Sequence, residues 1–170
     1  LQKAQTTIDQ LAHSFDQTST DYAKFLLLKS EFFMNSNLLI EAEVAISKTQ
    51  IILAQGRDTD MSSVLQLQRA ELDFKVNNYS KAKKTLEELL PTLINSKQFY
   101  AAAKAQLDLF RVTSITGEYL ISKDYLTQSI RLSEKYDFNT LLKDSYLLYS
   151  ELLKEEEEFE KSITYLQRYT

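Results

Sequence analysis

The sequence contains no cysteine, one histidine, one proline and only two glycines among its 170 residues. Without cysteine, disulfide bonds and thiolate metal sites are excluded, although the cellular compartment stays open. Turns in β-sandwiches and Rossmann folds depend on glycine and proline, so their scarcity argues against any loop-rich architecture. Apolar runs such as Phe25 to Leu28 are far shorter than the roughly 18 residues that cross a bilayer. We therefore expect no membrane contact by this segment.

A strongly basic character is also missing. The formal net charge is −4 and the isoelectric point is about 5.1. Proteins that bind nucleic acid normally carry a basic patch, so we expect no nucleic acid partner for this segment. The length suits a single domain, and the mixture of 44% hydrophobic and 26% charged residues argues against wholesale disorder.

Residues for catalysis are scarce. Nucleophile–base chemistry uses histidine or cysteine beside an acid, and the chain offers only His13, which we interpret as an ordinary helix residue. Gly56 and Gly117 lie too far apart for a phosphate-binding loop. No paired-histidine metal motif is present. The sequence thus predicts no enzymatic activity, no cofactor and no metal ion.

What the sequence does contain is a repeat of 40 residues without insertion or deletion. Residue types recur at this step in several columns, and internal repetition of this length is typical of helical solenoids. The columns hold an apolar or aromatic residue (Leu39, Tyr79, Tyr119, Phe159), a small residue three positions later (Ala42, Ala82, Ser122, Ser162), a leucine (Leu27, Leu67, Leu107, Leu147) and an aliphatic residue (Ile46, Leu86, Leu126, Leu166).

Each repeat has two stretches with the apolar spacing of amphipathic helices, separated by a polar turn. Asn37, Asn77 and Gly117 in these turns tolerate the left-handed conformation that ends helices. Candidate N-caps precede the apolar stretches at Ser19 or Thr20, at Asp60 and at Asn139. The periodicity predicts helices over residues 1–15, 20–35, 38–55, 60–75, 79–96, 98–114, 118–135, 139–154 and 158–170.

A helix–turn–helix unit with these small and aromatic columns resembles the tetratricopeptide repeat (TPR). The small columns let two helices approach closely, and the large ones fill the space between neighbours. The resemblance covers residues from about 20 to 170, and the 40-residue period is similar to the long variants in bacterial sensor kinases and regulators. It implies an all-α, right-handed solenoid of antiparallel helix pairs. We expect one repeat domain over 1–170, cut from a longer protein, with residues 1–18 as the second helix of a preceding repeat and repeats at about 19–58, 59–98, 99–138 and 139–170.

HEAT and armadillo repeats have a similar period and are the competing interpretation. They do not need the small–small contact, and they commonly carry a proline in the first helix. Here the single proline, Pro91, falls in a second helix. We therefore favour the TPR-like interpretation.

In TPR superhelices the first helix of each pair lines a concave groove that binds peptides or partner helices. The resemblance carries this role to candidate groove residues, which mix acids with the cations Lys104 and Arg111. An amphipathic or partly basic peptide therefore fits better than an acidic one. The alternative is that these are ordinary solvated side chains. The candidates are Lys24, Leu28, Glu31, Gln68, Glu71, Lys104, Asp108, Arg111, Asp144, Leu148 and Glu151.

Two other features have both a functional and a structural interpretation. The acidic run from Glu155 to Glu158 falls in a turn, where we expect a solvated stretch rather than a docking patch. Most tyrosines of the second half coincide with packing columns, which favours core packing over a ligand surface. These tyrosines are Tyr119, Tyr125, Tyr146, Tyr149, Tyr165 and Tyr169.

The resulting hypothesis is a non-enzymatic scaffold that binds a protein or peptide, as the sensory or regulatory module of a larger bacterial signalling or transcription-regulating protein. The alternative is a structural spacer that packs against further repeats or a second chain, for example as a homodimer. The cytoplasm is slightly favoured as the compartment, and the periplasm fits if the whole protein is a membrane sensor.

Overall fold

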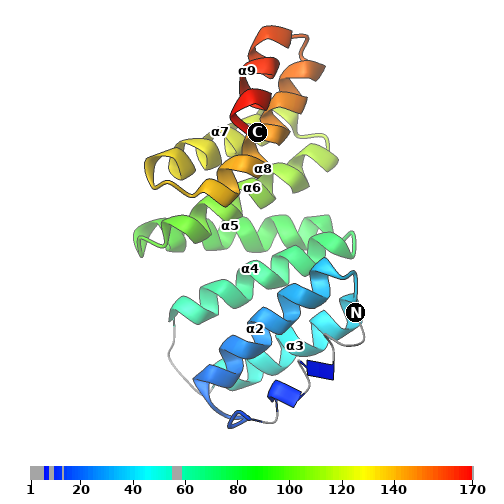
Figure 1. Ribbon diagram of the computed structural model, residues 1–170, viewed down its shortest axis with the longest axis vertical. Coiled ribbons are helices and arrows are strands. Elements are labelled where there is room, and N and C mark those ends of the chain that lie inside the picture. The colour runs from blue at the N-terminus through cyan, green and yellow to red at the C-terminus, as the bar shows by residue number, and fades with distance from the viewer. Residues whose placement is uncertain (1–5, 8–9, 13, 55–58, 170) are drawn as a thin grey trace. The chain divides into compact units, whose positions relative to one another are not determined.

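The computed structural model describes residues 6–7, 10–12, 14–54 and 59–169. In this part of the chain eight α-helices follow one another, with no strand (Figure 1). The predicted all-α fold of antiparallel helix pairs is confirmed, and the helix bounds agree with the prediction to within two residues. The helices are α2 (Thr20–Asn35), α3 (Leu39–Leu53), α4 (Thr59–Lys75), α5 (Tyr79–Asn95), α6 (Phe99–Ile115), α7 (Tyr119–Lys135), α8 (Asn139–Glu155) and α9 (Phe159–Tyr169).

The helix predicted over 1–15 is described only in part. Residues 6–7 and 10–12 are helical, and Ser14 and Phe15 lie in a turn. His13 lies outside the described residues. Phe15 stacks on Phe25 of α2, with 5.1 Å between the ring centroids.

The chain forms two compact units, Leu1–Thr85 and Leu86–Thr170, and α5 runs from one into the other. In the first unit α2 and α3 form an antiparallel pair, and α4 packs against both of them (Figure 1). The unit has a hydrophobic core cluster drawn from all three helices, and Ser30 and Gln68 are buried polar residues of the same unit. The cluster consists of Leu27, Phe33, Met34, Ala42, Ile46, Leu65 and Leu72.

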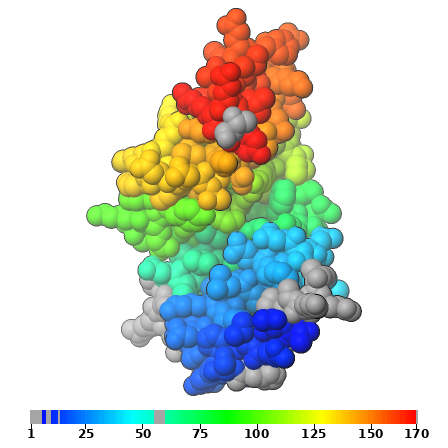
Figure 2. Space-filling view, viewed as in Figure 1, coloured from blue at the N-terminus to red at the C-terminus, as the bar shows by residue number. Residues whose placement is uncertain are grey.

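In the second unit α6 pairs with α7 and α8 pairs with α9, while α8 also contacts α6 and α7. Figure 2 shows α8 in orange beside α9 in red. The small column does permit close approach, because the Ser162 hydroxyl of α9 reaches the Ser150 carbonyl of α8 at 2.7 Å. The core consists of Ala103, Leu107, Phe110, Leu126, Ile130 and Leu141.

The last repeat is less buried than the others. Ile46, Leu86 and Leu126 are at most 1% exposed, whereas Leu166 in the same column is 45% exposed. Within the described residues no helix follows α9, so nothing in that part of the chain covers this face.

The turns repeat every 20 residues, half of the predicted period. One left-handed residue follows each of six helices, at 37, 77, 97, 117, 137 and 157, with φ between 56° and 82°. The next amide reaches back five residues, as from Leu38 to the Phe33 carbonyl at 2.8 Å and from Gln98 to the Leu93 carbonyl at 2.9 Å. This is the Schellman arrangement, which satisfies the last carbonyls of a helix. The left-handed residues predicted at Asn37, Asn77 and Gly117 are confirmed.

Of the predicted N-caps, the one at Ser19 is confirmed, and those at Asp60 and Asn139 are not. Ser19 is the N-cap of α2, and its hydroxyl accepts the Tyr22 amide at 3.1 Å. The prediction for Asn139 is wrong, since Phe138 holds that position without a side-chain bond. Asp60 lies inside α4 rather than before it. At Asn139 the physical reason is that the connection is so short that Phe138, which completes the Schellman turn of α7, also begins α8.

The turn geometry yields a stability prediction. Lys97 adopts a left-handed φ of 60°, which costs a side-chain-bearing residue about 1 kcal/mol more than glycine. We expect Lys97→Gly to raise the free energy of unfolding by about 0.5–1 kcal/mol in urea denaturation, after the added entropy of the unfolded chain is subtracted.

Gly117→Ala is the matched reverse change. A Cβ at Gly117 would meet nothing within 4 Å, so its expected cost of about 1 kcal/mol is purely conformational. A Lys97→Gly variant less stable than the unaltered chain would contradict the prediction.

Candidate functional site on the first helices

The predicted groove residues lie on the first helix of each pair. Lys24, Leu28 and Glu31 belong to α2, and Gln68 and Glu71 to α4, all in the first unit. The second unit holds the rest on α6 and α8: Lys104, Asp108, Arg111, Asp144, Leu148 and Glu151.

In the first unit the α2 candidates are exposed. Their spacing of four and three residues places them on one side of the helix. Lys24 forms an ion pair with Asp21 in the preceding turn, at 3.2 Å. Leu28 is 68% exposed.

Gln68 differs from these residues because it is buried between α2 and α4. Its amide nitrogen donates to the Leu27 carbonyl at 3.0 Å, and its carbonyl oxygen accepts the Ser30 hydroxyl. Such bonds satisfy a buried amide and join the two first helices of this unit. In this arrangement Gln68 holds the helices rather than facing a ligand, while Glu71 beside it is half-buried.

In the second unit four candidates form one ion network. Asp108 is buried and accepts from Lys104 at 3.3 Å and from Arg111 at 2.9 Å. The other end of the Arg111 guanidinium lies 3.8 Å from Asp144 of α8. Spacings of three and four residues bring the α6 members together. Leu148 packs against the core beside them, and Glu151 is exposed.

The network balances two cations with two carboxylates. Asp108 fixes the direction of Arg111, because a buried carboxylate holds a guanidinium through charge-assisted bonds. The Asp144 side chain is 57% exposed, so water screens its weaker contact. A ligand acceptor can therefore replace Asp144 at Arg111 while Asp108 keeps the cation in place.

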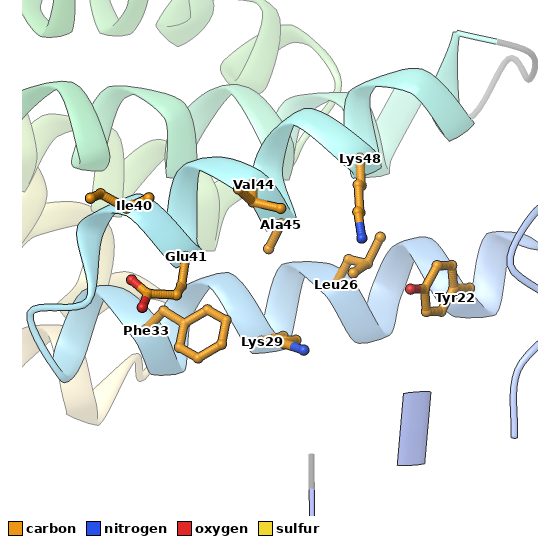
Figure 3. A pocket seen from close by; sticks show the side chains of 9 residues that line it. All are labelled: Tyr22, Leu26, Lys29, Phe33, Ile40, Glu41, Val44, Ala45 and Lys48. Carbon is orange, nitrogen blue, oxygen red and sulfur yellow. The ribbon is translucent and has the colours of Figure 1, made fainter. Parts of the chain in front are cut away.

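A hollow of about 260 Å³ lies between α2 and α3 in the first unit. Figure 3 shows Leu26 of α2 near Ala45 of α3, Phe33 of α2 beside Glu41 of α3, and the Lys48 side chain extending from α3 toward Leu26. The sequence analysis missed this hollow. Ile40 lines the hollow and is 79% exposed although it is apolar, and the sequence alone does not show this exposure.

Two of the four acids in the acidic run form ion pairs inside the second unit. Glu156 accepts from Lys123 at 2.5 Å and Glu158 pairs with Lys161. The hydrogen bond from Lys161 lowers the pKa of Glu158, and the hydrogen bond to Glu156 raises the pKa of Lys123. These contacts support the interpretation as a solvated turn.

Three of the tyrosines pack together. The Tyr165 ring lies 5.7 Å from Tyr146 and 4.7 Å from Tyr149, and the Arg168 guanidinium lies 5.2 Å from the Tyr165 ring. Burial, and then a hydrogen bond to Glu134 of α7, raise the pKa of Tyr146. The cluster connects α7, α8 and α9, which supports a packing role.

The described helices include none that is long and apolar enough to cross a membrane. In the same part of the chain no group of three or more histidine, cysteine, aspartate or glutamate residues is placed to hold a metal ion.

The ion network yields a second prediction. Asp108→Asn removes the charge but keeps the shape, so the bonds from Lys104 and Arg111 lose their charge assistance. We expect the free energy of unfolding to fall by about 1–2 kcal/mol in urea denaturation.

Asp144→Asn is its control, and we expect a change below about 0.5 kcal/mol because that contact is long and exposed. Equal losses for the two variants would show that Asp108 does not organise the network.

No protein-family model matches the sequence, and no curated protein matches it. A solved structure does resemble it: the crystal structure of aspartyl phosphate phosphatase F from Bacillus subtilis, with a TM-score of 0.78 over 91% of this chain. The two sequences are 13% identical, so the likeness concerns the fold alone. This chain spans 40% of the length of that protein. The fold is that of a TPR-like helical repeat protein.

Proposed function

We propose that this chain is a non-enzymatic module that binds a protein or peptide within a larger bacterial regulatory protein. The observation that carries the proposal is the ion network of the second unit, where Arg111 of α6 bridges to Asp144 of α8. A partner that contacts both residues contacts the first helices of two successive repeats at once. Extended peptide partners of helical repeats bind in this manner.

The chemistry of this face fits an amphipathic segment with mixed charge. Arg111 offers donors to a carboxylate or a backbone carbonyl, and Asp144 offers an acceptor to a lysine or arginine. Leu148, and Ile115 at 55% exposure in α6, provide apolar surface in the same unit. Such a ligand replaces the Arg111–Asp144 contact with two contacts of its own.

The Bacillus subtilis protein with the similar fold supports the bacterial regulatory part of the proposal. Its name states that it acts on aspartyl phosphate. We do not extend that activity to this chain, because the sequence holds a single histidine and no cysteine to serve as base or nucleophile.

The mechanism follows from the position of the contact. Occupation of Arg111 and Asp144 by a partner favours one spacing of α6 and α8 over others. A ligand shifts an equilibrium in proportion to its differential affinity for the two states. A small change between successive repeats can in this way reach an attached output domain.

A peptide selection tests the proposal. Peptides of about 12 residues, selected from a displayed random library on the immobilised chain, should bind with dissociation constants on the order of 10 μM. We expect Arg111→Ala to weaken selected peptides about tenfold in calorimetry, since a charged partner loses its bidentate contact.

Lys154→Ala is the control, because Lys154 is an exposed cation on α8 outside the network. A selection that yields no binders, or binders indifferent to Arg111, would overturn the proposal.

A second candidate function is self-association through α9, in line with the structural spacer. Phe159, Ile163 and Leu166 are 57%, 56% and 45% exposed, and their spacing forms one stripe. Two antiparallel copies of α9 would bury this stripe against each other in a symmetric contact.

Light scattering with size-exclusion chromatography across a concentration series tests this candidate. We expect the mass to rise from monomer toward dimer in the unaltered chain and to stay monomeric for Ile163→Glu, which puts charge in the centre of the stripe. Lys154→Glu on exposed α8 surface is the control. A monomer at all concentrations would eliminate self-association.

A further inference from the structure

A pocket of about 280 Å³ lies in the second unit where α5, α6 and α7 meet. It is on the side of α6 away from the ion network. Gln106 lines the pocket, and it is two positions from both Lys104 and Asp108, which is a rotation of about 200° around the helix. The pocket is therefore independent of the site proposed above. Its lining consists of Ile94, Phe99, Gln106, Gln128, Arg131, Leu132 and Lys135.

The lining carries positive charge without a carboxylate, although the whole chain has a net charge of −4. Arg131 is exposed and has no hydrogen-bond or ion-pair partner among the described residues. Lys135, one turn further along α7, lies over the Tyr136 ring at 5.2 Å. A guanidinium free of any carboxylate is suited to bind one in bidentate fashion.

A polar group in the wall also lacks a partner. Gln106 is 4% exposed, and its side-chain oxygen accepts no hydrogen bond within the described chain. Its nitrogen donates to Gln128 at 3.0 Å, and Gln128 donates in turn to Asp124 at 2.7 Å. Buried acceptors are normally satisfied, and an unsatisfied one gains from any N–H donor that reaches it. Gln128 is only half-buried, so a shift of its side chain opens that acceptor to a ligand.

The remaining wall is apolar. Phe99 stacks on Tyr136 with 4.4 Å between the ring centroids, and this stack fixes the end of the pocket beside Lys135. Ile94 and Leu132 provide aliphatic surface on the two flanking helices. The volume is at the small end for ligand pockets, so it suits one residue-sized group rather than a long chain.

We propose that this pocket binds an N-acylated apolar amino acid, either as a free small molecule or as the last residue of a peptide. The carboxylate binds Arg131, with Lys135 adding charge. The amide N–H next to the carboxylate reaches the Gln106 oxygen, and the apolar side chain packs against Phe99 and Leu132. One ligand thus satisfies the unpartnered cation, the unpartnered acceptor and the apolar wall.

An NMR titration of the isotope-labelled chain with N-acetyl-leucine tests the proposal. We expect saturable shifts of the Gln106 and Gln128 side-chain amides and a dissociation constant on the order of 1 mM for so small a ligand. N-acetyl-leucinamide, which lacks the carboxylate, should bind at least about tenfold more weakly.

Three variants test which side chains contribute to the binding of N-acetyl-leucine. Arg131→Met keeps the length of the side chain and should weaken N-acetyl-leucine about tenfold. Gln106→Leu should weaken it about threefold to tenfold without lowering the melting temperature, because it also removes the unsatisfied acceptor. A merely structural role for Gln106 would instead lower the melting temperature. Lys154→Met, on the exposed surface of α8, should leave the titration unchanged.

The tripeptide acetyl-glycyl-glycyl-leucine identifies the source of the ligand. Binding at least about tenfold tighter than N-acetyl-leucine assigns the site to a peptide end, and equal binding assigns it to a free small molecule. The proposal is overturned if N-acetyl-leucine gives no saturable shift up to about 20 mM, if the amide binds equally well, or if Arg131→Met has no effect.

Discussion

One backbone constraint underlies the architecture: a single left-handed residue follows each of six helices. These residues lie 20 positions apart, or a multiple of 20. The helices α4 to α8 are each 17 residues long, and three residues connect each of them to the next. With no variation in helix or turn length, a residue keeps its position on its helix from one repeat to the next. The 40-residue columns are therefore a consequence of turn geometry as much as of core packing.

The same constraint determines which positions of the repeat can form a binding site. Three columns of the first helices supply all of the candidate groove residues. One of these columns holds Glu31, Glu71, Arg111 and Glu151. Charge is reversed only at Arg111, and this is the position where the cation pairs with buried Asp108 and reaches Asp144. A departure from the column, rather than the column itself, marks the candidate site. Once the repeat is aligned, this departure can be read from the sequence.

Burial within a column could not be read in the same way. Leu28, Gln68 and Asp108 occupy one column, yet Leu28 is 68% exposed while Gln68 and Asp108 are 8% and 7% exposed. Periodicity fixes the direction of a side chain, but its burial depends on the neighbours it meets. Gln68 forms hydrogen bonds with Ser30 and a carbonyl of α2, and Asp108 pairs with two cations on its own helix.

Helix bounds were predictable because they depend on local pattern. Lys97 and Asp137 were missed as turn residues because neither is the asparagine or glycine that usually indicates a left-handed turn.

Opposite sides of α6 contribute to two candidate sites with different chemistry. On one side Lys104, Asp108 and Arg111 neutralise one another with Asp144, so a ligand there must replace an existing contact. On the other side Arg131 of α7 and the Gln106 oxygen have no partners in the described chain, so a ligand there need only supply what is missing. The first arrangement favours a large partner, because only a large partner offers enough contacts to offset the displaced one. The second favours a small ligand with few, well-placed groups, because the pocket has one cation free of partners, one open acceptor and room for a single apolar side chain.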